Sequence, residues 1–473
     1  MDTLELLPGR AHREEGRCAP LNEPGNMTLP TPSQAPTSAA PRLVENPVRG
    51  RYARLPLLAG RSFIPLGLFA RLPLAMLTVG ALTLVTAVTG SYAVGGVSAG
   101  AVGIGSALGA PVLGALADRR GQRPVLVFAA VFNTAAVIAL IFSVYLIPGG
   151  QDLGAALPVL AAAFVAGASC PQVGPLARVR WMALTSRGGR DANSADLDTA
   201  LSYESTADEL TFVLGPALVG ILASLVAPWL PLALAAALTI TLVPAFAVHP
   251  THSAVERARV RTPASAAHAK QLRASQPARQ RIGAFAAVAL PVLAMVCMGT
   301  FFGATQTALS SFSASFATSE LAGLLYAVMG LSSAAAALSV AYWPARFTAN
   351  VRWLACAALM TGLALLLLLP STALPMIFVL LVLGLPVGPL MVTVFAIGGL
   401  VAPAGKLGTV MTALASGIVA GTAVGSSIAG QLAQNHGYSA AFAVPVCAAA
   451  ALFLLGAAAA VAIRRRNGTA AAG

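Results

Sequence analysis

Charged residues are scarce in this chain of 473 residues: Asp, Glu, Lys and Arg together make up 10% of it, whereas hydrophobic residues make up 57%. Soluble globular proteins carry about 25% charged residues, and a chain with far fewer has too little polar surface to remain in water. The scarcity of charge therefore excludes a soluble protein. It indicates an integral membrane protein that is surrounded by the lipid bilayer.

Cysteine and histidine are also rare, with five of each. The cysteines show no paired spacing, and the histidines lie in predicted loops or tails, so we expect no disulfide bond and no metal site. A phosphate-binding loop is missing as well, because the only Gly-Lys pair, Gly405-Lys406, is followed by Leu407 and lacks the earlier glycine. The sequence predicts a protein that has no cofactor and that draws its energy from an ion gradient.

Long apolar runs are abundant, and an α-helix needs about 20 such residues to cross roughly 30 Å of hydrocarbon. We predict twelve transmembrane helices, with approximate limits 72–90, 93–117, 124–147, 154–177, 201–226, 229–248, 284–308, 321–345, 353–369, 373–401, 408–430 and 440–463. All 29 Lys and Arg residues fall in the terminal segments or near the even-numbered loops. Short cytoplasmic loops hold the basic residues, so both termini are predicted to be cytoplasmic, with the protein in the plasma or inner membrane.

The net charge of +13 follows from this topology and attracts anionic lipid headgroups, so we expect no nucleic-acid partner. The two sets of six spans have nearly equal length, and PQVGPL at 171–176 in span 4 is echoed by PVGPL at 386–390 in span 10. These features indicate a duplication. The expected parts are a disordered tail (1–64), two six-helix bundles (65–248 and 283–463), a cytoplasmic linker (249–282) and a carboxyl-terminal tail (464–473).

The tail shows no secretory signal, because no apolar core with a cleavage site precedes Pro65. It contains Met27, which opens a shorter reading frame, and we hypothesise that translation starts there.

The loop after the second span has the sequence GALADRRGQR at residues 114–123, with one acid and three arginines between two apolar runs. It resembles motif A of the major facilitator superfamily of secondary transporters, G-x-x-x-D-R-x-G-R/K-R/K, with Gln122 at a usually basic position. The resemblance implies an all-α fold of twelve helices in two pseudo-symmetric six-helix bundles. It implies a transporter that works by alternating access, and not an enzyme.

Within this loop, Gly114 and Gly121 allow close helix approach and a tight turn, and Asp118 can accept hydrogen bonds from the first residues of a neighbouring helix or pair with an arginine. The resemblance places its partners near the inner ends of spans 4 and 11, where Arg178 and Arg180 are the candidates. We expect a cytoplasmic gate here. The alternative is that Arg119, Arg120 and Arg123 only fix the orientation in the membrane.

Span 5 contains Gly215, Pro216 and Gly220, which resemble part of motif C, G-x-x-x-G-P-x-x-G-G, a motif associated with proton-driven antiporters. Ordinary packing of small residues is the alternative. The same span carries Glu204, Asp208 and Glu209, and acids inside a span are functional candidates. They either form a gating network with Arg178, Arg180 and the loop arginines, or one of them carries the coupling proton. Arg71 is expected to extend to the inner headgroups.

The resemblance places a solute cavity among spans 1, 4, 7 and 10. Spans 1, 7 and 10 have no charged residue near the bilayer centre, which favours a lipophilic or weakly polar solute. Candidate lining residues are polar or aromatic: Thr83, Thr86, Gln172, Thr300, Phe301, Phe302, Gln306 and Thr393. We expect a monomeric proton-coupled exporter of a small molecule. A proton-coupled uptake symporter is the alternative, and a membrane enzyme or non-transporting sensor is a remote one.

Overall fold

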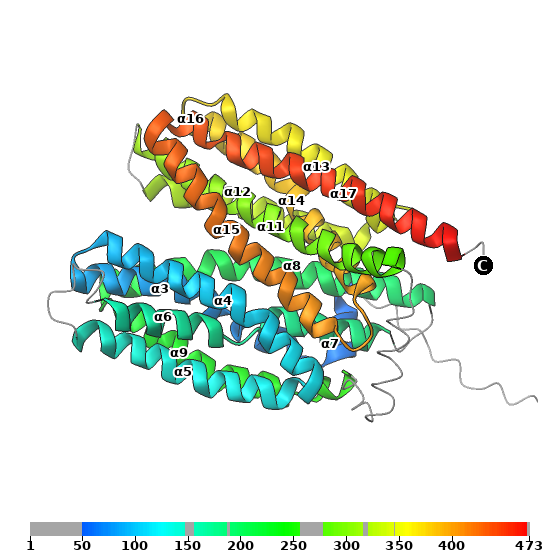
Figure 1. Ribbon diagram of the computed structural model, residues 1–473, viewed down its shortest axis with the longest axis horizontal. Coiled ribbons are helices and arrows are strands. Elements are labelled where there is room, and N and C mark those ends of the chain that lie inside the picture. Colours follow the sequence, from blue (N-terminus) through cyan, green and yellow to red (C-terminus); the bar gives the residue numbers. More distant parts are fainter. Residues whose placement is uncertain are drawn as a thin grey trace, which may run out of the picture. The chain divides into compact units, whose positions relative to one another are not determined.

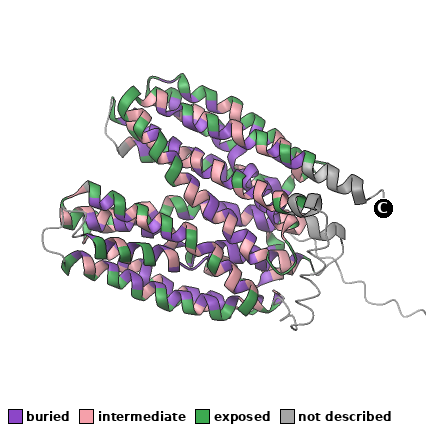
Figure 2. Ribbon diagram, in the orientation of Figure 1, coloured by how far each residue is buried: buried purple, intermediate pink, exposed green. Residues whose placement is uncertain are grey.

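The computed structural model describes residues 50–146, 156–186, 190–255, 278–315, 320–344 and 346–470. These residues are helical apart from short connections, and no strand occurs among them. Twelve helical segments within the described residues are long and apolar enough to cross a membrane, which confirms the predicted number of spans. Large apolar side chains such as Phe128, Phe142 and Leu454 are exposed on the helices, and Figure 2 shows exposed residues along their outer sides. Such a surface suits lipid rather than water.

The first six spans have the following bounds: α2 (Phe63–Phe69) continued by α3 (Leu72–Thr89), α4 (Tyr92–Arg120), α5 (Gln122–Leu146), α6 (Leu157–Ser169) continued by α7 (Val173–Thr185), α8 (Arg190–Leu225) and α9 (Leu230–Val248). The fourth span is interrupted between α6 and α7 because Pro171 cannot donate a helical hydrogen bond and restricts Cys170, which is extended. A short helix, η2 (Pro250–Ala254), follows α9.

The last six spans are α11 (Ala278–Ala314), α12 (Glu320–Ser339) with η3 (Val340–Tyr342), α13 (Ala349–Ala364) with η4 (Leu365–Leu368), α14 (Ala373–Val401), α15 (Leu407–His436), and α16 (Tyr438–Ala441) followed by α17 (Ala443–Ala470). Unlike its counterpart α6–α7, α14 continues through Pro386 and Pro389. The echoed Pro-rich segments therefore adopt different local structures in the two halves.

Helix pairing repeats with an offset of six spans. In the first half α4 packs on α6, α5 on α9 and α3 on α8, and the corresponding pairs in the second half are α12 with α14, α13 with α17 and α11 with α15. Figure 1 shows the helices of each half grouped together. This repetition is the two-bundle arrangement that the sequence led us to expect.

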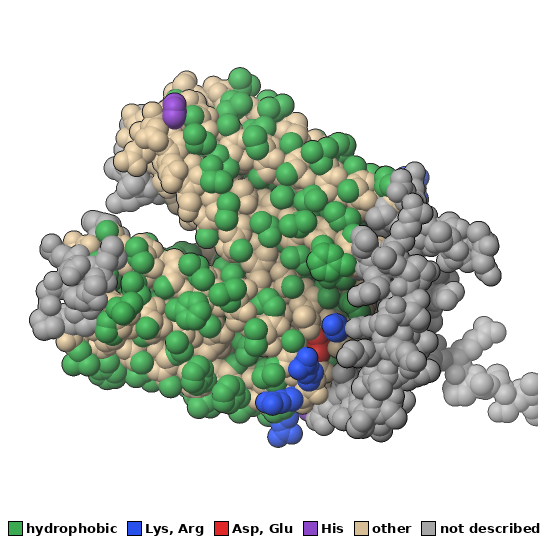
Figure 3. Space-filling view, viewed as in Figure 1, with side chains coloured by type: hydrophobic (Ala, Val, Ile, Leu, Met, Phe, Trp, Pro, Cys, Tyr) green, Lys and Arg blue, Asp and Glu red, His purple; other side chains and the backbone are tan. Residues whose placement is uncertain are grey.

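Contacts between the bundles follow the same symmetry: α4 meets α15, and its counterpart α12 meets α8; α7 meets α15, and its counterpart α14 meets α8. Basic side chains mark one end of the bundles, which we call the basic end; it carries Arg119, Arg120, Arg123 and Lys406. On the face in Figure 3 the charged side chains gather at this end, and the surface is hollowed between the bundles at the opposite end. We call that opposite end the distal end. The bundles are thus joined near the basic end and part toward the distal end.

The expected disordered tail is wrong for residues 51–64. Residues 51–59 form two short helices, η1 (Arg51–Arg54) and α1 (Leu55–Ala59). The first span begins at Phe63 instead of residue 72. The reason is a set of contacts that sequence patterns do not show: the Tyr52 hydroxyl donates to the Leu338 carbonyl over 2.6 Å, and Arg51 donates to the Ala341 carbonyl. Burial raises the pKa of Tyr52 to about 12, so its hydroxyl stays protonated. These donors satisfy carbonyls at the end of the eighth span.

Candidate functional site

Asp118, in the last turn of α4, binds the first turn of α15 in the other bundle. Its carboxylate accepts hydrogen bonds from the Gly408 amide (2.8 Å), the Thr409 amide (2.7 Å) and the Thr409 hydroxyl (2.6 Å). The N-cap residue of α15, Lys406, provides no side-chain cap of its own, so Asp118 satisfies these otherwise orphan donors and places a negative charge at the positive end of the helix. We call Asp118, Gly408 and Thr409 the basic-end latch.

The latch depends on glycine at two places. A Cβ atom on Gly114 would lie 2.0 Å from the Thr412 hydroxyl oxygen and 2.7 Å from the Gly408 carbonyl oxygen, so only glycine lets α4 approach α15 closely. Gly121 ends α4 with a φ of 89°, a conformation that favours glycine. Gly114 is therefore needed for the close approach of α4 to α15, and Gly121 is needed for the turn that follows α4.

Arg178 and Arg180 are not the partners of Asp118 that the sequence led us to expect. Both lie on α7 and are fully buried. Arg178 donates to Asp208 over 2.7 Å and lies 3.9 Å from the ring centre of Phe395 on α14. The expectation fails because Asp118 is directed at α15, whereas Arg178 faces α8 and α14. Arg178 still contacts both bundles.

Among the described residues, Arg180 forms hydrogen bonds only with the first bundle and with η2, which follows it. It donates to the Gln122 side-chain oxygen (2.8 Å), the Phe246 carbonyl (2.8 Å) and the Thr251 hydroxyl (3.0 Å). Motif A usually has a basic residue at position 122, and that residue would face the Arg180 guanidinium. The glutamine is thus explained by its buried cationic neighbour, a relation that the sequence analysis missed.

His249 lies beside the partners of Arg180, near the surface. Its ring nitrogens lie 3.1 Å from the Ser62 hydroxyl and 3.1 Å from the Thr251 hydroxyl. Partial burial and the nearby positive charge of Arg180 lower the pKa of His249. The neutral imidazole is the form that this environment favours.

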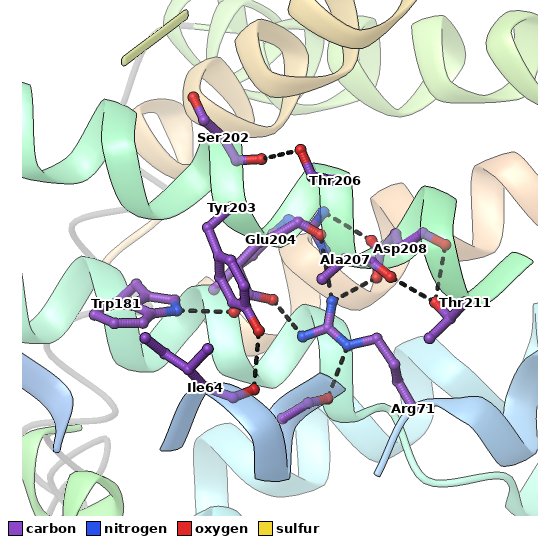
Figure 4. A network of polar contacts seen from close by, with 12 residues as sticks. Ile64, Arg71, Trp181, Ser202, Tyr203, Glu204, Thr206, Ala207, Asp208 and Thr211 are labelled. Carbon is purple, nitrogen blue, oxygen red and sulfur yellow. Dashed lines mark hydrogen bonds and ion pairs between the residues drawn. The ribbon is translucent and has the colours of Figure 1, made fainter. Parts of the chain in front are cut away.

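Arg71 is buried and does not extend to headgroups, which corrects the expectation for this residue. Its guanidinium pairs with Glu204 over 2.6 Å and with Asp208 over 2.8 Å, and it also donates to the Gly67 carbonyl over 2.9 Å. Figure 4 shows Arg71 directed toward these two acids of α8. The physical reason is that the acids of α8 require counter-ions, and Arg71 supplies one at the junction of α2 and α3.

The four residues Arg71, Arg178, Glu204 and Asp208 form a buried cluster, which we call the ion cluster. Two cations balance two anions. The Trp181 indole donates to the second Glu204 oxygen over 2.8 Å, and Asp208 bridges both arginines. The ion cluster joins α3, α7 and α8 of the first bundle into one charge-neutral unit.

Glu209, the neighbour of Asp208, lies outside the ion cluster. It faces α12 of the other bundle, where the Ser333 hydroxyl donates to one carboxyl oxygen over 2.5 Å. The other oxygen is buried and has no hydrogen-bond partner within the described residues. The three acids of span 5 therefore fall into two classes, which their sequence spacing did not reveal.

The three arginines of the loop after α4 lie at the surface. Arg119, Arg120 and Arg123 are exposed, and none of them makes a hydrogen bond or ion pair with another residue in the described part of the chain. The expected network of these arginines with the acids of span 5 is not present in this structure.

The motif C-like residues lie on the uninterrupted helix α8. A Cβ atom on Gly215 would lie 2.7 Å from the Cβ atom of Ala75, so Gly215 packs α8 against α3 of the same bundle, whereas Gly220 faces open space. Pro216 is inside the helix. Gly215 therefore acts as a packing residue between spans 1 and 5.

The eight cavity candidates lie in different environments. Gln172, Phe301 and Thr393 are buried, Gln306 is exposed, and Thr83, Thr86, Thr300 and Phe302 are partly buried. The hydroxyls of Thr300 and Thr393 donate to carbonyls of their own helices, and no hydrogen bond within the described residues joins two of the eight. The structure does not bring them together into one polar site.

Comparison with known proteins identifies the family. The sequence model described as Major Facilitator Superfamily matches residues 63–412, which is most of the chain. The chain belongs to this superfamily. No curated protein sequence matches it.

Solved structures of major facilitator transporters share the fold. The human organic anion transporter MFSD10 (TETRAN) is 18% identical with a TM-score of 0.61, covering 84% of this chain and 98% of its own. A bacterial homologue of the iron transporter ferroportin, in an outward-facing state, is 12% identical with a TM-score of 0.60 and the same coverage. A variant of the E. coli fucose:proton symporter FucP is 14% identical with a TM-score of 0.57, covering 84% and 99%. These likenesses establish the fold of a multi-pass membrane transporter, which is not an enzyme fold.

Proposed function

We propose that this transporter exports a small, lipophilic or weakly polar solute in exchange for protons across the plasma or inner membrane. The observation that carries the proposal is the basic-end latch: Asp118 of one bundle holds α15 of the other bundle, while the surface is hollowed at the distal end. A transporter that alternates between two states needs such a releasable contact at one end. With the basic end in the cytoplasm, this state is open to the outside.

The charge distribution supports a solute without a strong negative charge. The two buried arginines of the ion cluster, Arg71 and Arg178, are both paired with carboxylates of α8. Arg180 of α7 has no carboxylate partner among the described residues, but its guanidinium is bound to Gln122 and Phe246 of the first bundle and to Thr251 of η2. A dicarboxylate or phosphate would require an unpaired cation inside the membrane, and the central helices α3, α11 and α14 have none near the bilayer centre. An apolar or weakly polar solute requires no such partner.

Exchange for protons rests on the partial motif C of α8 and on the acids of the same helix. An uptake symporter is the second candidate, since the solved structures of this fold include the fucose:proton symporter. The two functions predict opposite directions of solute movement under the same pH gradient.

Direction of flux distinguishes them. Everted membrane vesicles with and without the protein are prepared with a lumen more acidic than the medium. A panel of neutral and cationic lipophilic solutes is then added. An exporter accumulates a solute inside everted vesicles, and a protonophore abolishes the accumulation. Accumulation in right-side-out vesicles under an outside-acid gradient would instead establish the symporter, and no protein-dependent movement of any compound would contradict both.

A further inference from the structure

Among the acids of α8 whose side chains the structure describes, Glu209 alone has no cation beside it. Glu204 and Asp208 are held by Arg71 and Arg178 at 2.6 to 2.8 Å. Protonating either acid would leave a buried guanidinium without its partner, which is strongly unfavourable. These two carboxylates balance the two buried guanidinium groups of the ion cluster.

Glu209 is in a different position. Its side chain is buried, its single hydrogen-bond partner is the Ser333 hydroxyl at 2.5 Å, and its second oxygen has no partner within the described residues. An ionised carboxylate in this place would be a buried charge without compensation, which is costly, whereas the neutral acid is tolerated. A hydroxyl donates to a carboxylate and accepts from a carboxylic acid, so Ser333 fits both forms of Glu209.

The titratable groups around Glu209 do not compensate a negative charge on its carboxylate. On α8 itself the neighbour is Asp208, whose charge is balanced by both arginines of the ion cluster. From α12 the titratable side chain that interacts with Glu209 is Tyr326, which is neutral near pH 7. Of the other helices packed against α8, α7 carries Arg178, which pairs with Asp208, and Arg180, which bonds Gln122, Phe246 and Thr251. The helices α14, α9 and the body of α3 contain no Asp, Glu, His, Lys or Arg. No cation in the described structure therefore neutralises Glu209.

The position of Glu209 links its protonation to the movement of the bundles. Thr206, Glu209 and Val213 lie on one face of α8 by their spacing of three and four residues. All three meet α12: the Thr206 hydroxyl donates to the Ala334 carbonyl over 3.1 Å, Glu209 bonds Ser333, and a Cβ atom on Gly330 would lie 3.5 Å from Val213. Since α8 and α12 belong to different bundles, opening the basic end separates them and brings water to Glu209.

We propose that Glu209 is the side chain that takes up and releases the coupling proton, and that its contact with Ser333 makes proton release depend on opening of the basic end. This inference rests on the proposed proton-coupled function. In the outward-open state an O–H bond forms on Glu209 with a proton from the distal side, giving the neutral acid. When α8 and α12 separate, that bond breaks and the proton passes to water at the basic end. One proton thus moves inward in each cycle without any oxidation or reduction.

The test measures the separation of the bundles as a function of pH. Spin labels on Val248→Cys and Leu400→Cys, two exposed positions at the basic ends of α9 and α14, are introduced into the full chain with its native cysteines replaced. A His249→Asn background removes the surface imidazole as a source of pH dependence. Distances between labels are recorded in lipid nanodiscs from pH 5 to pH 9, with no solute required.

We expect the closed form to lose population as pH rises, with a change of at most about tenfold per pH unit in the ratio of closed to open forms, the limit for one titrating group. Glu209→Gln mimics the neutral acid and should stay closed at every pH. Glu209→Asp should keep the pH dependence with a shifted midpoint. Thr206→Val is the matched control, because it removes a neighbouring hydrogen bond between the same helices without removing a titratable group, and it should keep the pH dependence.

Two results would overturn the inference in different ways. If the wild-type distances depend on pH and Glu209→Gln shows the same dependence, another group carries the proton while the proposed function stands. If the wild-type distances are the same at every pH, proton coupling itself fails, and the assignment of Glu209 fails with it.

Discussion

Replacing Asp118 with asparagine tests the basic-end latch most sharply. The carboxylate accepts three hydrogen bonds, from the Gly408 amide, the Thr409 amide and the Thr409 hydroxyl. Asparagine has nearly the same shape, but it offers one acceptor oxygen and turns an NH₂ group toward one of these donors. It also removes the negative charge from the start of α15. The substitution therefore disrupts the contact while leaving the size of the side chain unchanged.

The magnitude follows from the lost interactions. A hydrogen bond to a charged group contributes about 1.5–3 kcal/mol, and a charge at a helix terminus contributes about 0.3–1 kcal/mol when exposed. Losing one such bond and the charge should weaken the closed state by about 2–4 kcal/mol. At about 1.4 kcal/mol per factor of ten, the ratio of closed to open forms should fall by about 30- to 700-fold.

The assay is the distance between labels at Val248→Cys and Leu400→Cys at a fixed pH. We expect Asp118→Asn to shift the distribution toward separated basic ends. Lys406→Gln is the matched control, since it removes a charge at the same junction from an exposed side chain that makes no hydrogen bond within the described residues, and it should leave the distribution unchanged. An unaltered distribution in Asp118→Asn, in protein of normal thermal stability, would refute the latch.

Three further predictions concern packing, charge and pH. Gly114→Ala should also open the basic end, because the added methyl would clash with Thr412 and Gly408; a closed distribution equal to wild type would contradict this. Arg71→Gln should destabilise the fold by about 3–5 kcal/mol, because it leaves two buried carboxylates short of a cation; pairing it with Glu204→Gln should restore part of the melting temperature, and no restoration would argue against the ion cluster. The pKa of His249 is below its ordinary value of about 6.5, so its contribution to stability is complete above that pH and is lost as pH falls; melting temperatures from pH 8 to pH 5 should decrease less in His249→Asn than in wild type, and identical decreases would refute the assignment.

The number of spans, their approximate limits and the repeat of six helices could be predicted from the sequence. The membrane requires a run of apolar residues for each crossing, so this information is local and each helix shows it independently. The symmetric pairing of helices, such as α4 with α6 and α12 with α14, follows from the duplication that the echoed segments indicated.

Side-chain partners could not be predicted in the same way, because they join distant parts of the chain. Asp118 and Gly408 are 290 residues apart, and Arg71 and Glu204 are 133 residues apart. Two features of the sequence agree with the observed partners, although we did not predict these partners from them. The acids of span 5 require buried cations, which Arg71 and Arg178 supply, and Gln122 stands at a usually basic position beside Arg180.

Simultaneous recording of solute and proton movement tests the central claim most directly. Purified protein is reconstituted in liposomes with a trapped pH indicator, and an outward gradient of a solute identified in the vesicle panel is imposed without any initial pH difference. Exchange predicts that the lumen becomes more acidic as the solute leaves, and that Glu209→Gln abolishes the acidification. A lumen that becomes more alkaline, or solute efflux with no change in pH, would contradict the account.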